Sequence, residues 1–142
     1  MAGLSPTARS VAYVRQNNLY IEDLVSRQIT ALPASIDRHI INGTFDWVYE
    51  EELSLRDGFA WSPDGTKIAY WQLDTSGVPE FTLVDNTDGL YPRLTTFAYP
   101  KVGQRNSACR VGVVCATGFG YGVWAGSDFV LHFAVRAALW GF

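Results

Sequence analysis

Short runs of β-branched and aromatic residues, separated by sequences typical of turns, recur along this chain. Two such runs extend from Val11 to Val14 and from Leu19 to Ile21, with Asn17 and Asn18 between them. A third run extends from Ile68 to Leu73. Runs of this length and composition predict strands, and the Asn-rich link predicts a tight turn. The pattern is that of an all-β protein.

Part of this pattern occurs twice. Ser5-Pro6 and Val11-Ala12-Tyr13 match Ser62-Pro63 and Ile68-Ala69-Tyr70 at a constant offset of 57 residues. Repeated units of a few short strands, about 40–50 residues long, are typical of β-propeller blades. The extra length between the two copies is assigned to an insertion that carries residues 42 to 56.

The chain length limits the architecture. At about 40–50 residues per blade, 142 residues supply roughly two to three blades, whereas closed propellers have about four to eight. We therefore expect an incomplete β-propeller. Such an array leaves strand edges and part of an apolar interface uncovered, which predicts association through the open blade edges.

The insertion carries the longest run of like charge in the chain. Glu50, Glu51 and Glu52 follow Asp46, where a short helix is expected to begin. Neighbouring ionised carboxylates raise one another's pKa, and a cation within about 4–6 Å relieves the repulsion. The free N-terminus of a peptide is such a cation. A solvated acidic helix end is the alternative, and the triplet taken alone favours that alternative.

Composition excludes several classes of function. The chain is 48% hydrophobic and 18% charged, with a net charge of −3 and no run of Lys or Arg that could follow a phosphate backbone, so no nucleic-acid partner is expected. The apolar residues 129–142 are too short a run to span a bilayer, which needs about 20 apolar residues. The N-terminus shows no signal-peptide pattern, and no cell compartment is indicated.

The sequence also gives no sign of a metal, a cofactor or a nucleophile. Cys109 and Cys115 are too few for a zinc site and are interpreted as two buried thiols, and His39 and His132 have no ligand-like neighbours. None of the nine serines stands in a Gly-x-Ser-x-Gly sequence. No catalytic residue, metal site or cofactor is therefore expected in this chain.

Two features near the acidic run have alternative interpretations. Trp47 and Tyr49 are expected to be core residues, the alternative being that they form walls of the acidic site. Asn42-Gly43-Thr44 fits a glycosylation sequon, but Asn-Gly is first of all a turn dipeptide.

Three segments together resemble a known family. They are the heptad Asp46-Trp47-Val48-Tyr49-Glu50-Glu51-Glu52, the blade sequence Trp61 to Tyr70, and Tyr99-Pro100-Lys101-Val102-Gly103 followed by Asn106. Over residues 5 to 114 the chain resembles the dipeptidyl peptidase IV family, which consists of prolyl-oligopeptidase-type serine exopeptidases with a propeller and a hydrolase domain. The heptad and the Tyr-Pro-Lys segment are its more specific motifs.

The resemblance implies a function for the acidic run. Glu51 and Glu52 match the two glutamates with which the family binds the substrate's amino terminus, while Glu50 matches a neighbour without that direct role. The implied ligands are peptides with a free N-terminus, from which the family releases dipeptides. The family's catalytic Ser, Asp and His lie in a C-terminal α/β-hydrolase domain that this chain does not reach, so the chain is expected to be inactive alone. The alternative is a non-enzymatic β-propeller module that binds a protein or peptide.

The resemblance does not extend through the C-terminal part of the chain. Residues 1–114 are interpreted as part of the family's N-terminal β-propeller domain, and residues 115–142 as a divergent tail. Because the blade pattern is lost abruptly, a truncation or an altered reading frame after about residue 118 is the hypothesis for this tail.

Overall fold

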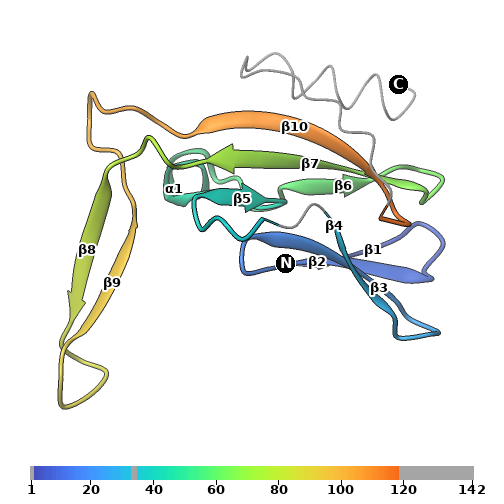
Figure 1. Cartoon of the computed structure of the whole chain (residues 1–142), viewed down its shortest axis with the longest axis horizontal. Helices are drawn as coiled ribbons and strands as arrows, with labels where there is room; N and C mark the ends of the chain where they lie inside the picture. Colours follow the sequence, from blue (N-terminus) through green and yellow to red (C-terminus); the bar gives the residue numbers. More distant parts are fainter. Residues whose placement is uncertain (1, 33–34, 119–142) are drawn as a thin grey trace.

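The computed structural model describes residues 2–32 and 35–118. They form two main antiparallel sheets, one short helix and one separate hairpin (Figure 1). The first sheet contains β1 (Ala2–Leu4), β2 (Ser10–Arg15), β3 (Asn18–Asp23) and β4 (Ile29–Leu32), in that order. The second contains β5 (Ile40–Asn42), β6 (Phe59–Trp61), β7 (Lys67–Asp74) and β10 (Ala108–Cys115).

A two-residue turn joins β2 to β3. Gln16 and Asn17 both have positive φ, 50° and 60°, as a type I′ turn requires. The predicted strands are confirmed here, and the turn lies one residue earlier than expected because Asn18 already pairs with Arg15. The twist of a type I′ turn matches that of the strands, so this hairpin sets the register of the first sheet.

The 57-residue repeat is also a repeat of the structure. The β1–β2 pair and the β6–β7 pair have the same register, with Gly3 opposite Ala12 in one and Ala60 opposite Ala69 in the other. Each connecting loop contains a buried serine that binds the start of the next strand. The Ser10 N–H donates to Ser5 Oγ at 3.1 Å. In the second copy, the Lys67 N–H donates to Ser62 Oγ at 2.9 Å.

The first strand of the second sheet is interrupted by an excursion. Both β5 and β6 pair with β7, β5 with its last three residues and β6 with residues 68–70. Between these pairings, Trp71 bonds both ends of the excursion, since the Gly43 N–H donates to its carbonyl and its own N–H donates to the Gly58 carbonyl, each at 2.8 Å. The helix α1 (Trp47–Leu53) lies inside this excursion. The excursion therefore spans residues 44–57, close to the predicted 42–56.

Gly58 closes the base of this excursion. A Cβ atom on Gly58 would lie 2.6 Å from the carbonyl carbon of Gly43, a distance that packed atoms do not tolerate. Only glycine therefore allows the two ends of the excursion to approach each other this closely.

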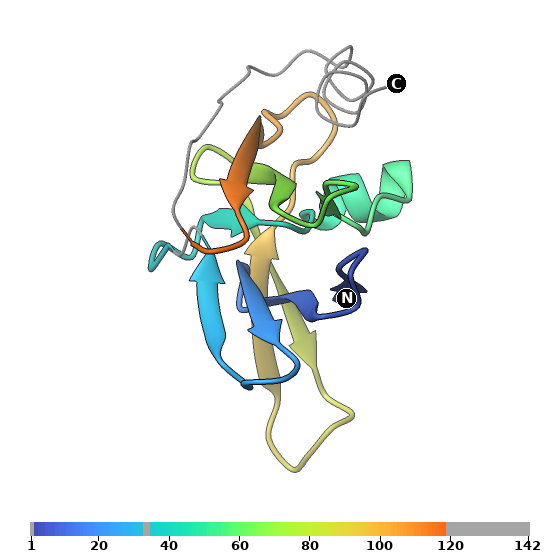
Figure 2. The same ribbon diagram turned by 90° about the vertical axis from the view of Figure 1, so that its right-hand side faces the viewer.

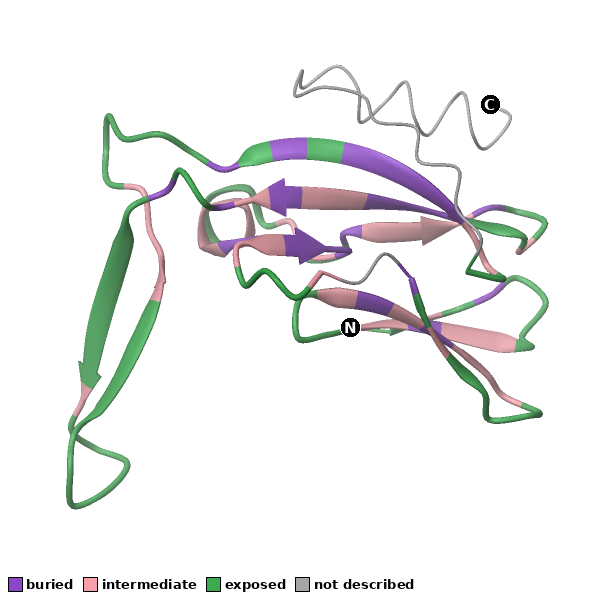
Figure 3. Cartoon of the chain, in the orientation of Figure 1, coloured by how far each residue is buried: buried purple, intermediate pink, exposed green. Residues whose placement is uncertain are grey.

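A second excursion leaves the same sheet between β7 and β10. It contains β8 (Glu80–Asp85) and β9 (Arg93–Ala98), which pair only with each other among the described strands. This hairpin extends away from the two sheets on the left of Figure 1, and most of its residues are exposed (Figure 3). No pattern noted in the sequence predicted this hairpin.

The two sheets share one apolar core. It contains Ala12, Leu19, Ile21 and Leu32 from the first sheet and Ile68, Tyr70 and Val114 from the second. In Figure 2 the two sheets are seen as separate layers, with α1 projecting from one side of the second. A smaller cluster lies behind α1 and contains Ile41, Phe45, Leu73 and Cys109.

The two cysteines are free thiols on one strand. Cys109 is buried, as expected, whereas Cys115 is only half-buried. Six residues of strand, at about 3.3 Å each, separate their Cα atoms by far more than a disulfide can bridge.

The expectations for the C-terminal tail fall largely on residues 119–142, outside the described part. Within the described ranges, no helix is long and apolar enough to cross a membrane.

Candidate functional site

The predicted helix begins where expected and carries the acidic run. Asp46 is its N-cap, with Oδ1 accepting from the Tyr49 N–H at 3.1 Å. The helix ends after two turns at Ser54, whose φ of 55° is left-handed. Only Glu50 lies in the first turn, so the first-turn amides offset the charge of Glu50 and not that of Glu51 and Glu52. These two carboxylates lie in the last turn, where the helix dipole opposes negative charge.

The three glutamates differ in their partners. Glu50 Oε1 pairs with Arg56 Nε at 3.4 Å. Glu51 and Glu52 are exposed, and within residues 2–32 and 35–118 neither carboxylate has a hydrogen-bond or ion-pair partner. The site thus presents two adjacent carboxylates that no ion pair within the described chain engages, an arrangement that favours binding of an external cation.

Phe45 and Tyr49 attach α1 to the second sheet. Their rings stack with centroids 5.9 Å apart, and Phe45 also contacts Trp71 at 6.2 Å. Burial raises the pKa of Tyr49 above its ordinary 10.0, and Cys109 and Asp46 add to the shift. Tyr49 therefore stays a neutral phenol, and its half-buried ring packs against the smaller apolar cluster, in accord with its interpretation as core.

Cys109 lies in the same cluster and is not a nucleophile at neutral pH. Its pKa is raised to about 11, chiefly by burial and further by the charge of Asp46. A thiol with that pKa remains protonated, and only the thiolate is reactive.

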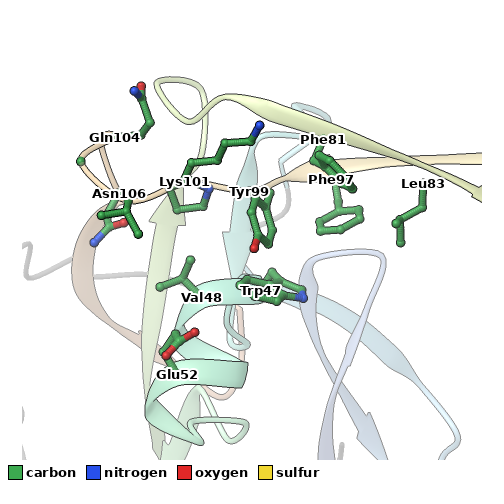
Figure 4. A pocket seen from close by; sticks show the side chains of 13 residues that line it. Trp47, Val48, Glu52, Phe81, Leu83, Phe97, Tyr99, Lys101, Gln104 and Asn106 are labelled. Carbon is green, nitrogen blue, oxygen red and sulfur yellow. The ribbon is translucent and has the colours of Figure 1, made fainter.

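Trp47 is half-buried and lines a cavity, which agrees with the alternative interpretation of Trp47 as a wall of the acidic site. Its ring lies against that of Tyr99, with centroids 4.4 Å apart. The cavity, of about 880 Å³, lies between α1 and the segment around β8 and β9. Figure 4 shows Trp47, Val48 and Glu52 on the helix side and Tyr99 and Lys101 on the opposite side.

Sequence reasoning missed this cavity. Tyr99 and Lys101 belong to the Tyr-Pro-Lys segment, which the sequence marked only as a motif of the family. The one sign that this segment and the acidic heptad are close in space is that both belong to excursions of the second sheet. Because Glu52 lines the cavity, a ligand held at the carboxylates would lie beside an aromatic surface.

Asp46 and His39 line a smaller cavity on the other side of Trp47, of about 250 Å³. The Arg38–Glu80 ion pair, at 2.9 Å, lies beside it. The backbone carbonyl of His39 accepts from Thr75 Oγ1 at 3.1 Å, and Nδ1 of its ring lies 3.5 Å from the same hydroxyl oxygen. Among the described residues, no three His, Cys, Asp or Glu side chains are grouped so that they could hold a metal ion.

Asn42 has a structural role that the sequence did not indicate. Its side chain is fully buried, accepts from Gln72 Nε2 at 2.8 Å and donates to Asn18 Oδ1 at 3.3 Å. These bonds join β3 of the first sheet to the second sheet. The glycosylation interpretation of Asn42 is therefore wrong for the folded chain, since a buried amide cannot accept a sugar.

Comparisons with known proteins agree with the motifs. The family model described as the dipeptidyl peptidase IV N-terminal region matches residues 1–121. Prolyl endopeptidase FAP of Mus musculus is 39% identical over 117 residues, which is 80% of this chain and 15% of that protein. Inactive dipeptidyl peptidase 10 of Rattus norvegicus is 35% identical over 109 residues, covering 75% of this chain and 14% of that protein. The chain thus spans about 15% of the length of the curated relatives it matches.

A solved structure supports the same relationship. The crystal structure of Porphyromonas gingivalis dipeptidyl peptidase 4 superposes on 90% of this chain with a TM-score of 0.81 and 32% identity, and 18% of that chain is covered. The predicted resemblance and the predicted incomplete β-propeller fold are confirmed.

Proposed function

We propose, because this chain belongs to the family of the dipeptidyl peptidase IV N-terminal region, that its helix α1 binds the free amino terminus of a peptide. The ligands of the ammonium group are Glu51 and Glu52. The bond-breaking chemistry of a dipeptidyl peptidase would then come from a hydrolase domain outside these residues, and this chain alone would not cleave peptides.

The observation that carries this proposal is the contrast within the acidic run. Arg56 neutralises Glu50, whereas Glu51 and Glu52 have no such partner in the described part of the chain. Two adjacent carboxylates at the end of a helix repel each other and oppose the helix dipole. An ammonium group relieves both effects and donates charge-assisted hydrogen bonds to both carboxylates.

Such a site would act as a ruler for a peptidase. Fixing the ammonium group fixes the position of the first peptide bonds, so that a nucleophile at a set distance meets only the bond after the second residue. In the family, a proline-like second residue is favoured. The carboxylates contribute positioning in this scheme, while the proton transfers of hydrolysis belong to other residues.

A second candidate is a module that binds peptides without hydrolysis. It is favoured by one relative, whose name describes it as an inactive dipeptidyl peptidase. Both candidates use the same fold, and they differ in whether a catalytic domain accompanies the blades. Sequencing of the downstream locus decides between them, since a nucleophile elbow in the same frame supports the peptidase and further blades alone support the module.

A titration of the 142-residue chain followed by amide NMR tests the amine site. The ligand is alanyl-prolinamide, and its N-acetylated form is the control ligand. We expect the free amine to shift the amide signals of Glu51, Glu52 and Leu53, and the acetylated form to leave them unchanged, because acetylation removes the charge.

Matched variants on the same helix complete the test. Glu51→Gln combined with Glu52→Gln should weaken binding of the free amine about tenfold or more, since charge-assisted hydrogen bonds are lost. Glu50→Gln should bind like the native chain, because the carboxylate of Glu50 already has a partner in Arg56. Equal binding of the free and acetylated ligands, or equal weakening in the double variant and in Glu50→Gln, would show that the run is only a solvated face.

A further inference from the structure

The two excursions of the second sheet meet at the start of α1. Asp46 uses both carboxylate oxygens there: Oδ1 caps the helix, and Oδ2 accepts a hydrogen bond from Ser107 Oγ. Ser107 lies directly before β10, at the end of the second excursion. Both side chains are buried, with 7% and 8% of their surface exposed. A buried hydrogen bond to a carboxylate is among the stronger ones in proteins, so this contact fixes the cap.

A second contact joins the same two excursions. The ring of Trp47, the first residue of α1, packs on the ring of Tyr99 just after β9. Tyr99 is itself held by Phe81 and Phe97, at centroid distances of 5.5 and 6.1 Å, and its N–H donates to the Pro79 carbonyl at 2.8 Å. Tyr99 therefore presents a braced aromatic surface to the helix (Figure 4).

The helix depends on such contacts for its orientation. It has seven residues, and isolated helices shorter than about 12–15 residues are marginal in water. In its C-terminal turn, the side chains of Glu51 and Glu52 have no hydrogen-bond or ion-pair partner in the described chain, while Leu55 just beyond the helix packs on the smaller apolar cluster. The direction of these carboxylates therefore depends on the anchored residues on either side of them, residues 46 to 49 at the start of the helix and Leu55 after its end.

We propose that Ser107 and Tyr99 are positioning residues for the amine site. Through Asp46 and Trp47 they fix the start of α1 and thereby the place at which Glu51 and Glu52 hold an ammonium group. The β8–β9 excursion is then part of the substrate site although it supplies neither of the two carboxylate ligands. This inference rests on the proposed function, because the orientation of Glu51 and Glu52 matters only if their carboxylates bind an amine.

The experiment uses the 142-residue chain and two readouts. Hydrogen exchange of the Tyr49 and Glu50 amides reports the order of α1, since both donate to Asp46, and exchange in β2 and β3 reports the rest of the fold. Titration with alanyl-prolinamide and its N-acetylated form reports the amine site. Ser107→Ala removes the bond to Asp46, and Tyr99→Leu removes the ring that supports Trp47.

We expect both substitutions to speed exchange of the two α1 amides about tenfold or more, without a change in β2 and β3. Each should also weaken binding of the free amine about fivefold to tenfold, because misplaced ligands bind less well. Tyr99→Phe keeps the ring and should behave like the native chain, which separates positioning from a general loss of structure.

The outcomes distinguish the two proposals. If the native chain does not discriminate the free from the acetylated ligand, the proposed function fails and this inference fails with it. If the native chain discriminates but both substitutions leave the free-amine affinity unchanged, the positioning role alone is overturned. Loosening of α1 with unchanged affinity, or equal loss of affinity in Tyr99→Phe, also overturns it.

Discussion

At the scale of single residues, the site depends on two positions that carry no charge. Gly43 and Gly58 bring the two ends of the first excursion together on Trp71. This closed base fixes where the excursion that carries Glu51 and Glu52 leaves the sheet. The acidic run therefore depends on the close approach of two glycines, one on each side of it in the sequence. A search for charged motifs does not consider these positions.

Gly58→Ala tests this requirement. The new Cβ would lie 2.6 Å from Gly43 backbone atoms, which cannot move like a flexible side chain. We expect the free energy of unfolding to fall by about 1–3 kcal/mol or more, measured by urea denaturation. Gly89→Ala is the matched control, since nothing lies within 4 Å of its Cβ, and an equal loss in both variants would contradict the steric explanation.

The carboxylate of Asp64, in the loop between β6 and β7, predicts that the stability of the chain falls in acid. Hydrogen bonds from Ser62 Oγ and from the amide and hydroxyl of Thr66 lower its pKa from the ordinary 3.8 to about 2. Because the folded pKa is the lower one, the stability that this carboxylate contributes is present above about pH 4 and is lost as the pH falls towards 2.

Asp64→Asn should therefore reduce the loss of stability between pH 5 and pH 2.5, as measured by urea midpoints at both values. Asp57→Asn is the control, because this exposed side chain has no hydrogen bond within the described chain. The explanation is wrong if the native chain and Asp64→Asn lose the same stability over this range.

At the scale of elements, local signals determined the strands well. The runs around Val11, Leu19 and Ile68 became β2, β3 and β7, and the repeat of 57 residues became two hairpins of equal register. These signals are local, since β-branched runs and turn residues act on their own neighbours. The N-cap of α1 was found for the same reason, because an Asp before a helix binds amides only three residues away.

Contacts between elements were not predicted. The strands of the β8–β9 hairpin are exposed almost throughout, so they lack the buried–exposed alternation that marks a strand, although its loop carries the turn dipeptide Asp88-Gly89. Its role is seen only when Tyr99 meets Trp47 across 52 residues. The pairing of Asp46 with Ser107 is likewise a long-range contact. Neither contact is marked by a periodic pattern or a fixed spacing of residues, so a single sequence does not predict them.

The β2–β3 turn gives a prediction at this scale. Gln16 and Asn17 both have positive φ, which costs free energy at a non-glycine residue. Replacing them by Asn and Gly, the preferred type I′ pair, should stabilise the chain by about 0.5–1 kcal/mol in urea denaturation. Placing the same Asn-Gly pair at residues 25 and 26, where neither residue has positive φ, should not stabilise the chain. Stabilisation at both places would show that the gain does not come from the turn.

At the scale of the whole molecule, the two sheets form part of a propeller and do not close a ring. Among the described strands, β4 and β10 each end a sheet with one edge unpaired. Ile29 on β4 is 56% exposed, so an apolar side chain lies on this edge. Exposed strand edges with apolar residues favour pairing with another chain.

We expect the purified chain to associate as its concentration rises in sedimentation velocity. Ile29→Lys should reduce this association, because a charge on an edge strand opposes pairing. Val25→Lys is the control, since Val25 is 81% exposed but lies outside the strands. A chain that stays monomeric at all concentrations would contradict the predicted association through open edges.

The central claim, that Glu51 and Glu52 hold an ammonium group, is tested most directly by the pH dependence of binding. The affinity of the native chain for alanyl-prolinamide is measured from pH 6 to pH 9.5. A peptide amine has a pKa of about 7.7–8.0, so the affinity should be constant up to about pH 7 and then fall about tenfold per unit above pH 8 as the ligand loses its charge. An affinity that stays constant across this range would contradict the claim, because a neutral amine would then bind as well as an ammonium group.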